Sequence, residues 1–309
     1  MNQIKPADPA LPLRILRFPL TAMIVGFVVF SFAYGFSAQP ASRAMPWHGT
    51  PLQALAALAG AAAGIGLYKL FRRYVEGGAD FEFPLPLAAR ELGTGLLFGF
   101  LLFSGMTGVV WLLGGIQFGG VRGMGNLWGM IALGIISGTF EEILFRGILF
   151  RQFEAMLGTW AALAITSILF GAGHIFNPGA TWFSSFAIAV EAGILLGAAY
   201  MITRRLWFPV AIHAAWNFTQ GWVFSVPVSG GKAPEGLLIT SRNGPDWLTG
   251  GAFGLEASAV AMVVATLAGV ILLARAIKRD GVRPPMWLRP AAPSPVPPVA
   301  ASPETLPPT

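Results

Sequence analysis

Three short motifs place ionisable and amide side chains inside stretches of the chain that are otherwise apolar. They are EEILFR from Glu141 to Arg146, FGAGH from Phe170 to His174, and HAAWN from His213 to Asn217. An ionisable group at membrane depth costs at least ~2.5 kcal/mol, so such residues are functional candidates by default. The pattern predicts chemistry that uses a carboxylate, two imidazoles and a carboxamide.

The spacing within the first motif decides which of its charges can act together. On a helix, residues i and i+4 share a face, whereas neighbours point about 100° apart. Glu142 and Arg146 can therefore form a charge-compensated pair in the favourable acid-first order. Glu141 faces elsewhere, above Ser137 and Gly138, whose small side chains leave space beside it. A carboxylate in such a cavity suits general-base work on water. The alternative is that these charges mark a helix end and reach toward the membrane surface.

The two histidine motifs repeat the four-residue spacing, so Phe170 with His174, and His213 with Asn217, each share one helix face. An imidazole and a carboxamide that project together can both donate hydrogen bonds, which a developing oxyanion requires. Taken singly, these residues can also be structural polar contacts between helices. Together, the three motifs supply a base, an orienting imidazole and oxyanion donors, the parts needed for hydrolysis of an amide by water.

Composition places these motifs in a membrane protein. Of the 309 residues, 55% are hydrophobic and 11% are charged, and the mean hydropathy is +0.66. A soluble domain averages about 25% charged residues. The lack of cysteine excludes disulfides, cysteine metal ligands and a cysteine nucleophile. No basic stripe or aromatic–basic module accompanies the high isoelectric point, so we expect no nucleic-acid partner.

Apolar runs long enough to cross ~30 Å of hydrocarbon predict an all-α, polytopic membrane bundle of about eight transmembrane helices around a polar catalytic cavity. The predicted spans are 19–37, 51–71, 92–115, 126–149, 159–176, 182–203, 207–226 and 256–275. With this alternation, all but four of the 20 lysines and arginines fall on one side of the membrane. The four exceptions are Arg43, Arg122, Lys232 and Arg242. The positive-inside rule then predicts a multi-pass protein of the plasma (inner) membrane with both termini cytoplasmic.

We expect three parts along the chain: a cytoplasmic N-terminal segment at 1–18, a membrane-embedded domain at 19–282 and a tail at 283–309. The first apolar run exceeds the ~7–15 residues of a signal-peptide core, which favours a signal anchor. The tail is so rich in proline that it is predicted to be a disordered cytoplasmic segment. The Gly-, Pro- and Ser-rich loop at 227–255 is expected outside the membrane without a domain of its own.

The ordered motifs EExxxR, FxxxH and HxxxN, with LWFPVAIHAAWNF around the third, resemble the CAAX prenyl protease 2 type (Rce1-like) intramembrane proteases, also called the CPBP or Abi family. The resemblance covers roughly 87–224. It implies a helical bundle around a conical cavity that is open towards the cytosol and the lipid. Eukaryotic and archaeal members remove the last three residues of a prenylated CaaX protein. Many bacterial members have other substrates, and some have roles in bacteriocin self-immunity.

By matching positions, the resemblance implies a role for each motif residue. The first Glu and the first His activate the attacking water, the second His and the Asn hold the oxyanion, and the second Glu and the Arg shape and charge-balance the site. The implied catalytic residues are Glu141, His174, His213 and Asn217. The implied supporting residues are Glu142, Arg146 and Phe170. The expected partners are membrane lipid and a protein or peptide substrate with a membrane-anchored C-terminus.

Whether zinc takes part is left open by the sequence. The family is commonly labelled as metalloproteases, and His174, His213 and Glu141 could offer a zinc ion two nitrogens and one oxygen, with a free fourth position. The motifs show no carboxylate dedicated to orienting either histidine, as metal-binding histidines usually have. Activation of water by glutamate and histidine without a metal is therefore favoured.

One acidic residue lies outside the motif pattern. Glu191, in the middle of the predicted span 182–203, either lines the cavity as an accessory acid or pairs with a neighbouring helix. Two other functions compete with proteolysis: a non-proteolytic immunity or scaffold protein, and a transporter, since buried Glu, His and Arg also build proton relays. No inverted repeat or pair of broken helices is apparent, and every residue of the motif triple is present. A peptidase is the preferred hypothesis.

Overall fold

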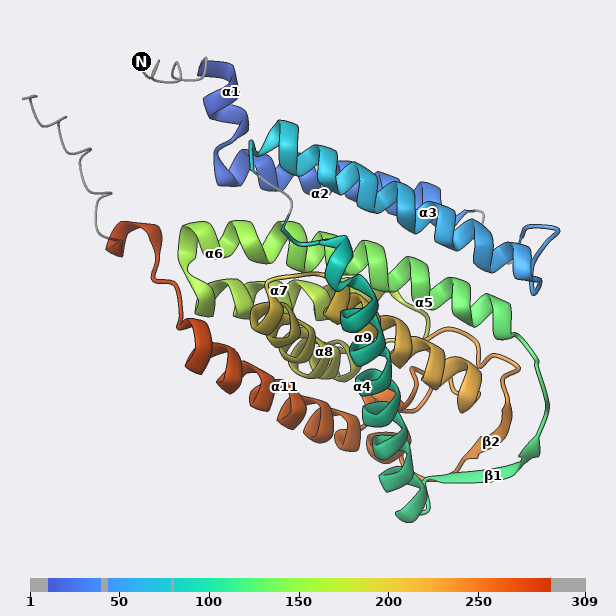
Figure 1. Cartoon of the computed structure of the whole chain (residues 1–309). Helices are drawn as coiled ribbons and strands as arrows, with labels where there is room; N and C mark the ends of the chain where they lie inside the picture. Colours follow the sequence, from blue (N-terminus) through green and yellow to red (C-terminus); the bar gives the residue numbers. More distant parts are fainter. Residues whose placement is uncertain (1–10, 40–43, 79–80, 290–309) are drawn as a thin grey trace, which may run out of the picture.

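The computed structural model describes residues 11–39, 44–78 and 81–289. Within these ranges, seven helical segments are long and apolar enough to cross a membrane. They are Pro19–Ala38, Pro51–Val75, Leu85–Leu112, Leu127–Leu157, Thr159–Phe176, Trp182–Thr203 and Ala259–Asp280. The predicted all-α polytopic bundle is confirmed (Figure 1).

Several of these segments combine α-helix with π-helical or 3₁₀ turns. In chain order the elements are α1 (Leu11–Leu16), α2 (Pro19–Ala38), α3 (Pro51–Leu70) with π-helical η1 (Phe71–Val75), α4 (Leu85–Leu112), β1 (Ile116–Val121), α5 (Leu127–Glu142) with π-helical η2 (Ile143–Phe150), α6 (Arg151–Leu157), α7 (Thr159–Gly173) with 3₁₀ η3 (His174–Phe176), α8 (Trp182–Thr203), α9 (Trp207–Phe218) with π-helical η4 (Thr219–Val223), β2 (Leu238–Arg242), α10 (Asp246–Thr249), 3₁₀ η5 (Leu255–Ala257), α11 (Ala259–Asp280) and 3₁₀ η6 (Met286–Leu288).

The span expected at 207–226 is shorter than the other seven. The α-helix α9 has 12 residues, and the π-helical turn η4 adds 5. At a rise of 1.5 Å per residue this segment reaches about 25 Å, less than the ~30 Å thickness of the hydrocarbon. It packs between α4 and α5. The last span also differs from its prediction, because its helix covers 259–280 rather than 256–275.

Glycines on both neighbouring helices allow α9 to approach closely. On α5, a Cβ atom at Gly138 would lie 2.9 Å from the carbonyl oxygen of Val210, and on α4 a Cβ atom at Gly99 would lie 2.7 Å from a carbonyl oxygen of α9. Both distances are too short for a side chain. The space expected beside Glu141 at Gly138 is therefore filled by the backbone of α9. This close approach brings the third motif against the first.

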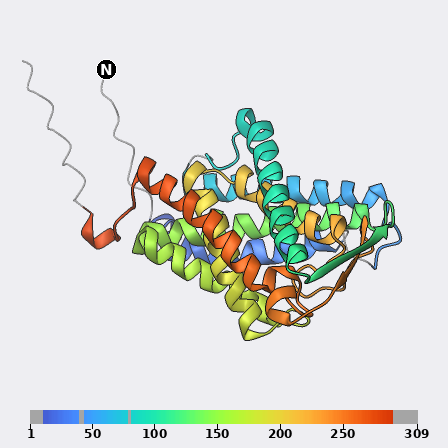
Figure 2. The same cartoon turned by 90° about the horizontal axis from the view of Figure 1, so that it is seen from below.

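The two ends of the bundle carry different elements. The helices α1, α6 and η6 lie at one end, and the strands β1 and β2 lie at the other (Figure 1). The strands pair antiparallel with Ile116 opposite Arg242, so the loop at 227–255 is tied to the segment that precedes α5. Helix α11 packs along α8 and covers the side away from α2 and α3 (Figures 1 and 2). Because both ends of the described chain lie at the same end of the bundle, the arrangement agrees with an even number of crossings.

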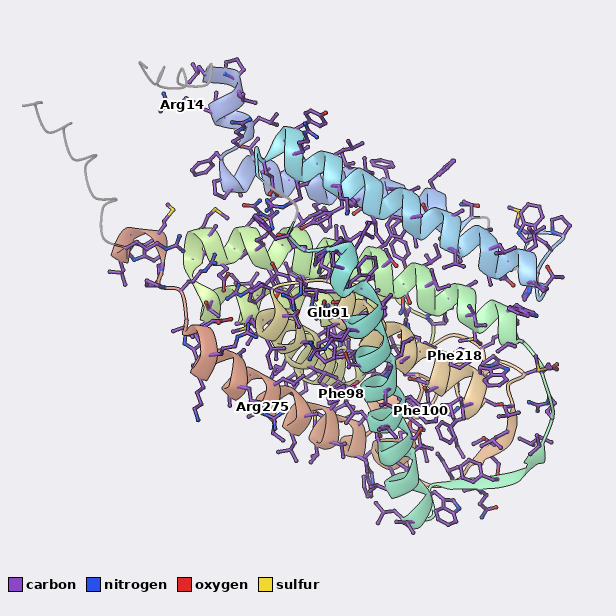
Figure 3. The ribbon with its side chains drawn as sticks, in the orientation of Figure 1. Arg14, Glu91, Phe98, Phe100, Phe218 and Arg275 are labelled. Atoms are coloured by element: carbon purple, nitrogen blue, oxygen red, sulfur yellow. The ribbon has the colours of Figure 1, made fainter. Side chains whose placement is uncertain are left out.

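Ion pairs hold together the end that carries α1 and η6, which we call the basic end. Buried or half-buried carboxylates bind its arginines in the pairs Arg72–Glu82, Arg151–Glu76, Arg204–Glu154 and Arg205–Glu91. Figure 3 shows Glu91 near the start of α4, and it shows Arg14 and Arg275 toward the same end. These pairs join helices that are distant in sequence.

The first residues of the predicted tail have defined contacts. The backbone N–H of Thr159 donates to the carbonyl of Arg283 at 3.0 Å, and the N–H of Arg283 donates to the Thr159 hydroxyl at 2.8 Å. The Arg289 guanidinium donates to the carbonyl of Glu154 at 2.9 Å. Residues 283–289 are thus fastened to the corner between α6 and α7. The rest of the predicted tail, and residues 1–10 of the N-terminal segment, lie outside the described residues.

Candidate active site

The three motifs meet at one cavity in the middle of the bundle. Glu141 is the penultimate residue of α5, His174 opens η3, and His213 and Asn217 lie one turn apart on α9. All four line a cavity of about 440 Å³, together with Phe170. The fold therefore brings the four predicted catalytic residues to one place.

Glu142 binds two side chains through a single oxygen atom. Its Oε1 accepts a hydrogen bond from Arg146 Nη1 at 3.0 Å and another from His213 Nδ1 at 2.9 Å. The carboxylate has no exposed surface and the guanidinium has 2%. The expected pair with Arg146 is formed. The structure also corrects one expectation: an orienting carboxylate for His213 exists, and it is Glu142.

Arg146 and Phe170 make further contacts that hold this arrangement in place. Arg146 Nη2 donates to the carbonyl of Ala192 at 3.1 Å, and its guanidinium carbon lies 4.8 Å from the centre of the Phe170 ring. The same ring packs edge-on against His213, with centroids 6.1 Å apart, and lies 4.9 Å from His174. Phe170 therefore fixes the positions of both imidazoles and shields the arginine from the cavity.

Glu141 has a different environment from its neighbour Glu142. Its Oε1 accepts a hydrogen bond from the Tyr34 hydroxyl at 3.0 Å, and its Oε2 lies 3.9 Å from His213 Nε2. The side chain is 18% exposed, into the cavity. Sequence reasoning missed Tyr34, which lies 107 residues earlier in the first apolar run. A single tyrosine in such a run gives no spacing signal.

The remaining two side chains are held by polar contacts of their own. His174 Nδ1 lies 2.7 Å from the carbonyl oxygen of Phe170. A carbonyl can only accept, so Nδ1 carries a proton, and Nε2 of the neutral ring is an acceptor. Asn217 Nδ2 donates to the Ser137 hydroxyl at 2.9 Å, and that hydroxyl donates to the carbonyl of Leu133 at 2.8 Å. Asn217 is thereby anchored to α5.

These side chains do not form a metal site. A catalytic zinc ion takes three protein ligands, and no three His, Asp or Glu in the described ranges are placed to hold a metal ion. The set of His174, His213 and Glu141 suggested by the sequence is therefore not placed to hold zinc.

Part of the cavity lining comes from connections between helices. It includes Asn177 and Pro178 from the α7–α8 connection, and Ser229 and Gly231 from the segment after α9. The resemblance implies a cavity open towards the cytosol, which the predicted topology assigns to the basic end and not to the end of the bundle that carries β1 and β2, which we call the strand end. The side on which the cavity opens stays a prediction.

Glu191 lies behind the site and does not form the expected pair with a neighbouring helix. It is fully buried, and neither of its carboxylate oxygens has a hydrogen-bond partner among the described residues. Glu256 of η5 lines the same enclosed hollow of about 30 Å³, together with His174 and His213. Burial raises the pKa of Glu256 to about 7, although hydrogen bonds from Ser229 oppose the rise. Sequence analysis missed Glu256 because it placed this residue at the start of the last span.

Comparison with known proteins agrees with the resemblance seen in the motifs. The family model for type II CAAX prenyl endopeptidase Rce1-like proteins matches residues 123–219, a stretch that contains all three motifs. No curated protein and no solved structure matches the chain. At the family level the match indicates a protease of the CAAX-processing type, and the seven apolar helices indicate an integral, multi-pass membrane protein.

Proposed function

We propose that this chain, whose residues 123–219 form an Rce1-like domain, is an intramembrane endopeptidase that uses water as its nucleophile. One observation carries the proposal. Of two adjacent glutamates, Glu142 is buried and hydrogen-bonded to Arg146 and His213. Glu141 faces a cavity large enough for a peptide segment. A partly exposed carboxylate in a mainly apolar cavity can take a proton from water.

In the proposed reaction, Glu141 accepts a proton from the water as the water oxygen bonds to the scissile carbonyl carbon. The Tyr34 hydroxyl holds Oε1 of this glutamate, which leaves Oε2 for the water. The acceptor Nε2 of His174 can orient the second hydrogen of the same water. When the tetrahedral intermediate collapses, the C–N bond breaks and the proton passes from Glu141 to the departing amine.

The developing oxyanion is proposed to accept hydrogen bonds from His213 and Asn217. His213 already donates through Nδ1 to Glu142, so donation through Nε2 requires a doubly protonated ring. The carboxylates of Glu141 and Glu142 flank this ring and stabilise that form. Preorganised donors of this kind are typically the largest contribution to acyl-transfer catalysis.

The proposed substrate is a membrane-associated protein or peptide cleaved near its C-terminus, with a prenylated CaaX-type chain as the specific expectation from the family. We infer that the basic end is cytoplasmic, in the plasma (inner) membrane. The basic loops of the described chain gather at that end, while Arg122, Lys232 and Arg242 lie at the strand end.

The test is a comparison of membrane-protein C-termini, by proteomics, between cells that carry the wild-type protein and cells that carry Glu141→Gln. A specific set of truncated C-termini that disappears in the variant is expected. Identical sets in both strains would instead favour the non-proteolytic immunity or scaffold alternative.

A further inference from the structure

A short segment after α9 forms one wall of the active cavity. Val228, Ser229 and Gly231 line this cavity together with Glu141 and Asn217. We call residues 227–231 the strap. The cavity has about 440 Å³, the size of an ordinary ligand pocket. A peptide bound at the catalytic side chains would therefore also contact the strap.

The backbone of the strap is fixed by its neighbours. Ser229 has a φ of +46°, in the left-handed region that residues other than glycine seldom adopt. The N–H of Gly230 donates to the carbonyl of Phe253 at 2.8 Å. A Cβ atom at Gly230 would lie 1.8 Å from the carbonyl oxygen of Pro178, so the strap passes directly against the α7–α8 connection. A strained backbone of this kind persists only where its surroundings determine it.

Glu256 is the acidic residue that binds the strap. It is buried, and its carboxyl group accepts a hydrogen bond from the backbone N–H of Ser229. The N–H groups of Trp216 and Gln220 face the same carboxyl group and favour its charged form. Gln220 also donates to the carbonyl of Pro227 at 2.5 Å. Glu256 therefore joins the strap to the helical segment that carries two of the predicted catalytic residues.

Glu191 offers a matched comparison, because it lines the same small hollow as Glu256. Its side chain is fully buried, and it has no hydrogen-bond partner among the described residues. It is not among the residues that line the active cavity. A change at Glu191 thus alters a carboxyl group in the same hollow without removing a contact to the strap.

We propose that the strap selects substrates by the size of the side chain next to the scissile bond, with Val228 as the contacting residue and Glu256 as the positioning residue that holds the strap in place. The selection rests on the proposed function, whereas the positioning does not. Val228 is half-buried and lines the cavity, so its volume limits the space that is left for the substrate.

Hydrogen exchange of the purified full-length protein tests the positioning without any hydrolysis. Glutamine at 256 has one acceptor oxygen, and its NH₂ group would face the surrounding donors. The amides of the strap should exchange at least about tenfold faster in Glu256→Gln, the effect of losing one hydrogen bond to a charged group. They should keep the wild-type rate in Glu191→Gln. Glu256→Asp, which retains both oxygens, should show a smaller increase.

Two results would overturn the role of Glu256. One is a wild-type rate of exchange in the strap of Glu256→Gln. The other is faster exchange throughout α8 and α11 as well, because that would show a general loosening of the bundle and not the release of one segment.

The selection is tested by the residues found beside the cut in the comparison of membrane-protein C-termini. Val228→Ala should raise the share of large residues at this position and Val228→Trp should lower it, each by roughly tenfold, as expected for a change of pocket volume. The matched control is Val263→Trp on α11, where the side chain is 54% exposed outside the cavity. The control should leave the distribution at the wild-type pattern.

The outcomes separate this inference from the proposed function. Truncated C-termini that require Glu141, but carry the same residues beside the cut in every Val228 variant, would overturn the selection and leave the proteolysis intact. Identical C-termini in the wild type and in Glu141→Gln would remove the proposed function and the selection with it. Hydrogen exchange would still decide whether Glu256 holds the strap.

Discussion

Glu142 and His213 lie 71 positions apart in the sequence and are joined by a hydrogen bond of 2.9 Å between Oε1 and Nδ1. The bond is buried, and its carboxylate is the same one that binds Arg146. The first and third motifs therefore form one polar unit in the interior of the bundle. A change at Glu142 is expected to disturb charge balance and imidazole orientation together.

The two neighbouring glutamates should respond differently to the same isosteric change. Glu141→Gln should lower turnover at least ~100-fold at an unchanged melting temperature, because an amide cannot take a proton from water. Glu142→Gln should lower the melting temperature as well, since removing one member of a buried ion pair costs roughly 3–5 kcal/mol. Turnover assays and thermal unfolding of the purified variants check this. Near-normal turnover in Glu141→Gln would mean that the roles are reversed.

The double change Glu142→Gln with Arg146→Met should recover part of the stability lost in the single variant, because it removes the uncompensated buried guanidinium. It should not recover full activity, since His213 would still lack its carboxylate partner. Denaturant unfolding of the single and double variants measures the first effect. A double variant that is no more stable than Glu142→Gln would show that the unpaired Arg146 is not the source of the loss.

Tyr34→Phe should lower turnover by about tenfold without a large loss of stability, because the change removes a hydrogen bond to a charged group, worth ~1.5 kcal/mol. The matched control is Tyr68→Phe, which removes a buried hydroxyl that donates to the carbonyl of Gly147 at 3.1 Å, away from the cavity. The control should lose stability and keep its turnover. Equal turnover in both variants would remove Tyr34 from the proposed mechanism.

Glu256 predicts a pH dependence of stability. The unfolded chain releases this proton near its ordinary value of 4.5, and burial raises the pKa of Glu256 in the folded state to about 7. The folded state therefore binds the proton more tightly than the unfolded chain does. This contribution to the free energy of unfolding is complete below pH 4.5 and is lost as the pH rises through 7, a change of roughly 3 kcal/mol. Glu256→Gln should flatten the melting temperature between these pH values. An unchanged slope would contradict this assignment.

Removal of metal ions should leave the activity intact. The donors around the cavity do not form a three-ligand set in the described chain. Purified protein is therefore expected to keep its turnover after exhaustive chelation and to contain less than stoichiometric zinc by elemental analysis. Loss of activity that added zinc restores would reassign His174 and His213 as ligands.

The periodicity of the sequence determined those features that depend on a single helix. Apolar runs predicted the membrane class and seven of the spans, because burial in lipid acts on each run separately. The four-residue spacing predicted the Glu142–Arg146 pair and separated it from Glu141, because helical phase alone sets these directions. The eighth predicted span, 207–226, is a helix at the expected position but is shorter than predicted. A helix enclosed by others need not span the bilayer.

Only the tertiary structure decided which faces meet. Glu142 reaches His213 because glycines on α4 and α5 let the backbone of α9 come close, and the packing of α2 on α5 brings Tyr34 to Glu141. The packing of the bundle also encloses Glu256 beside Glu191. Contacts of this kind join residues dozens of positions apart, and they depend on distances between helices that no repeat within a single helix encodes.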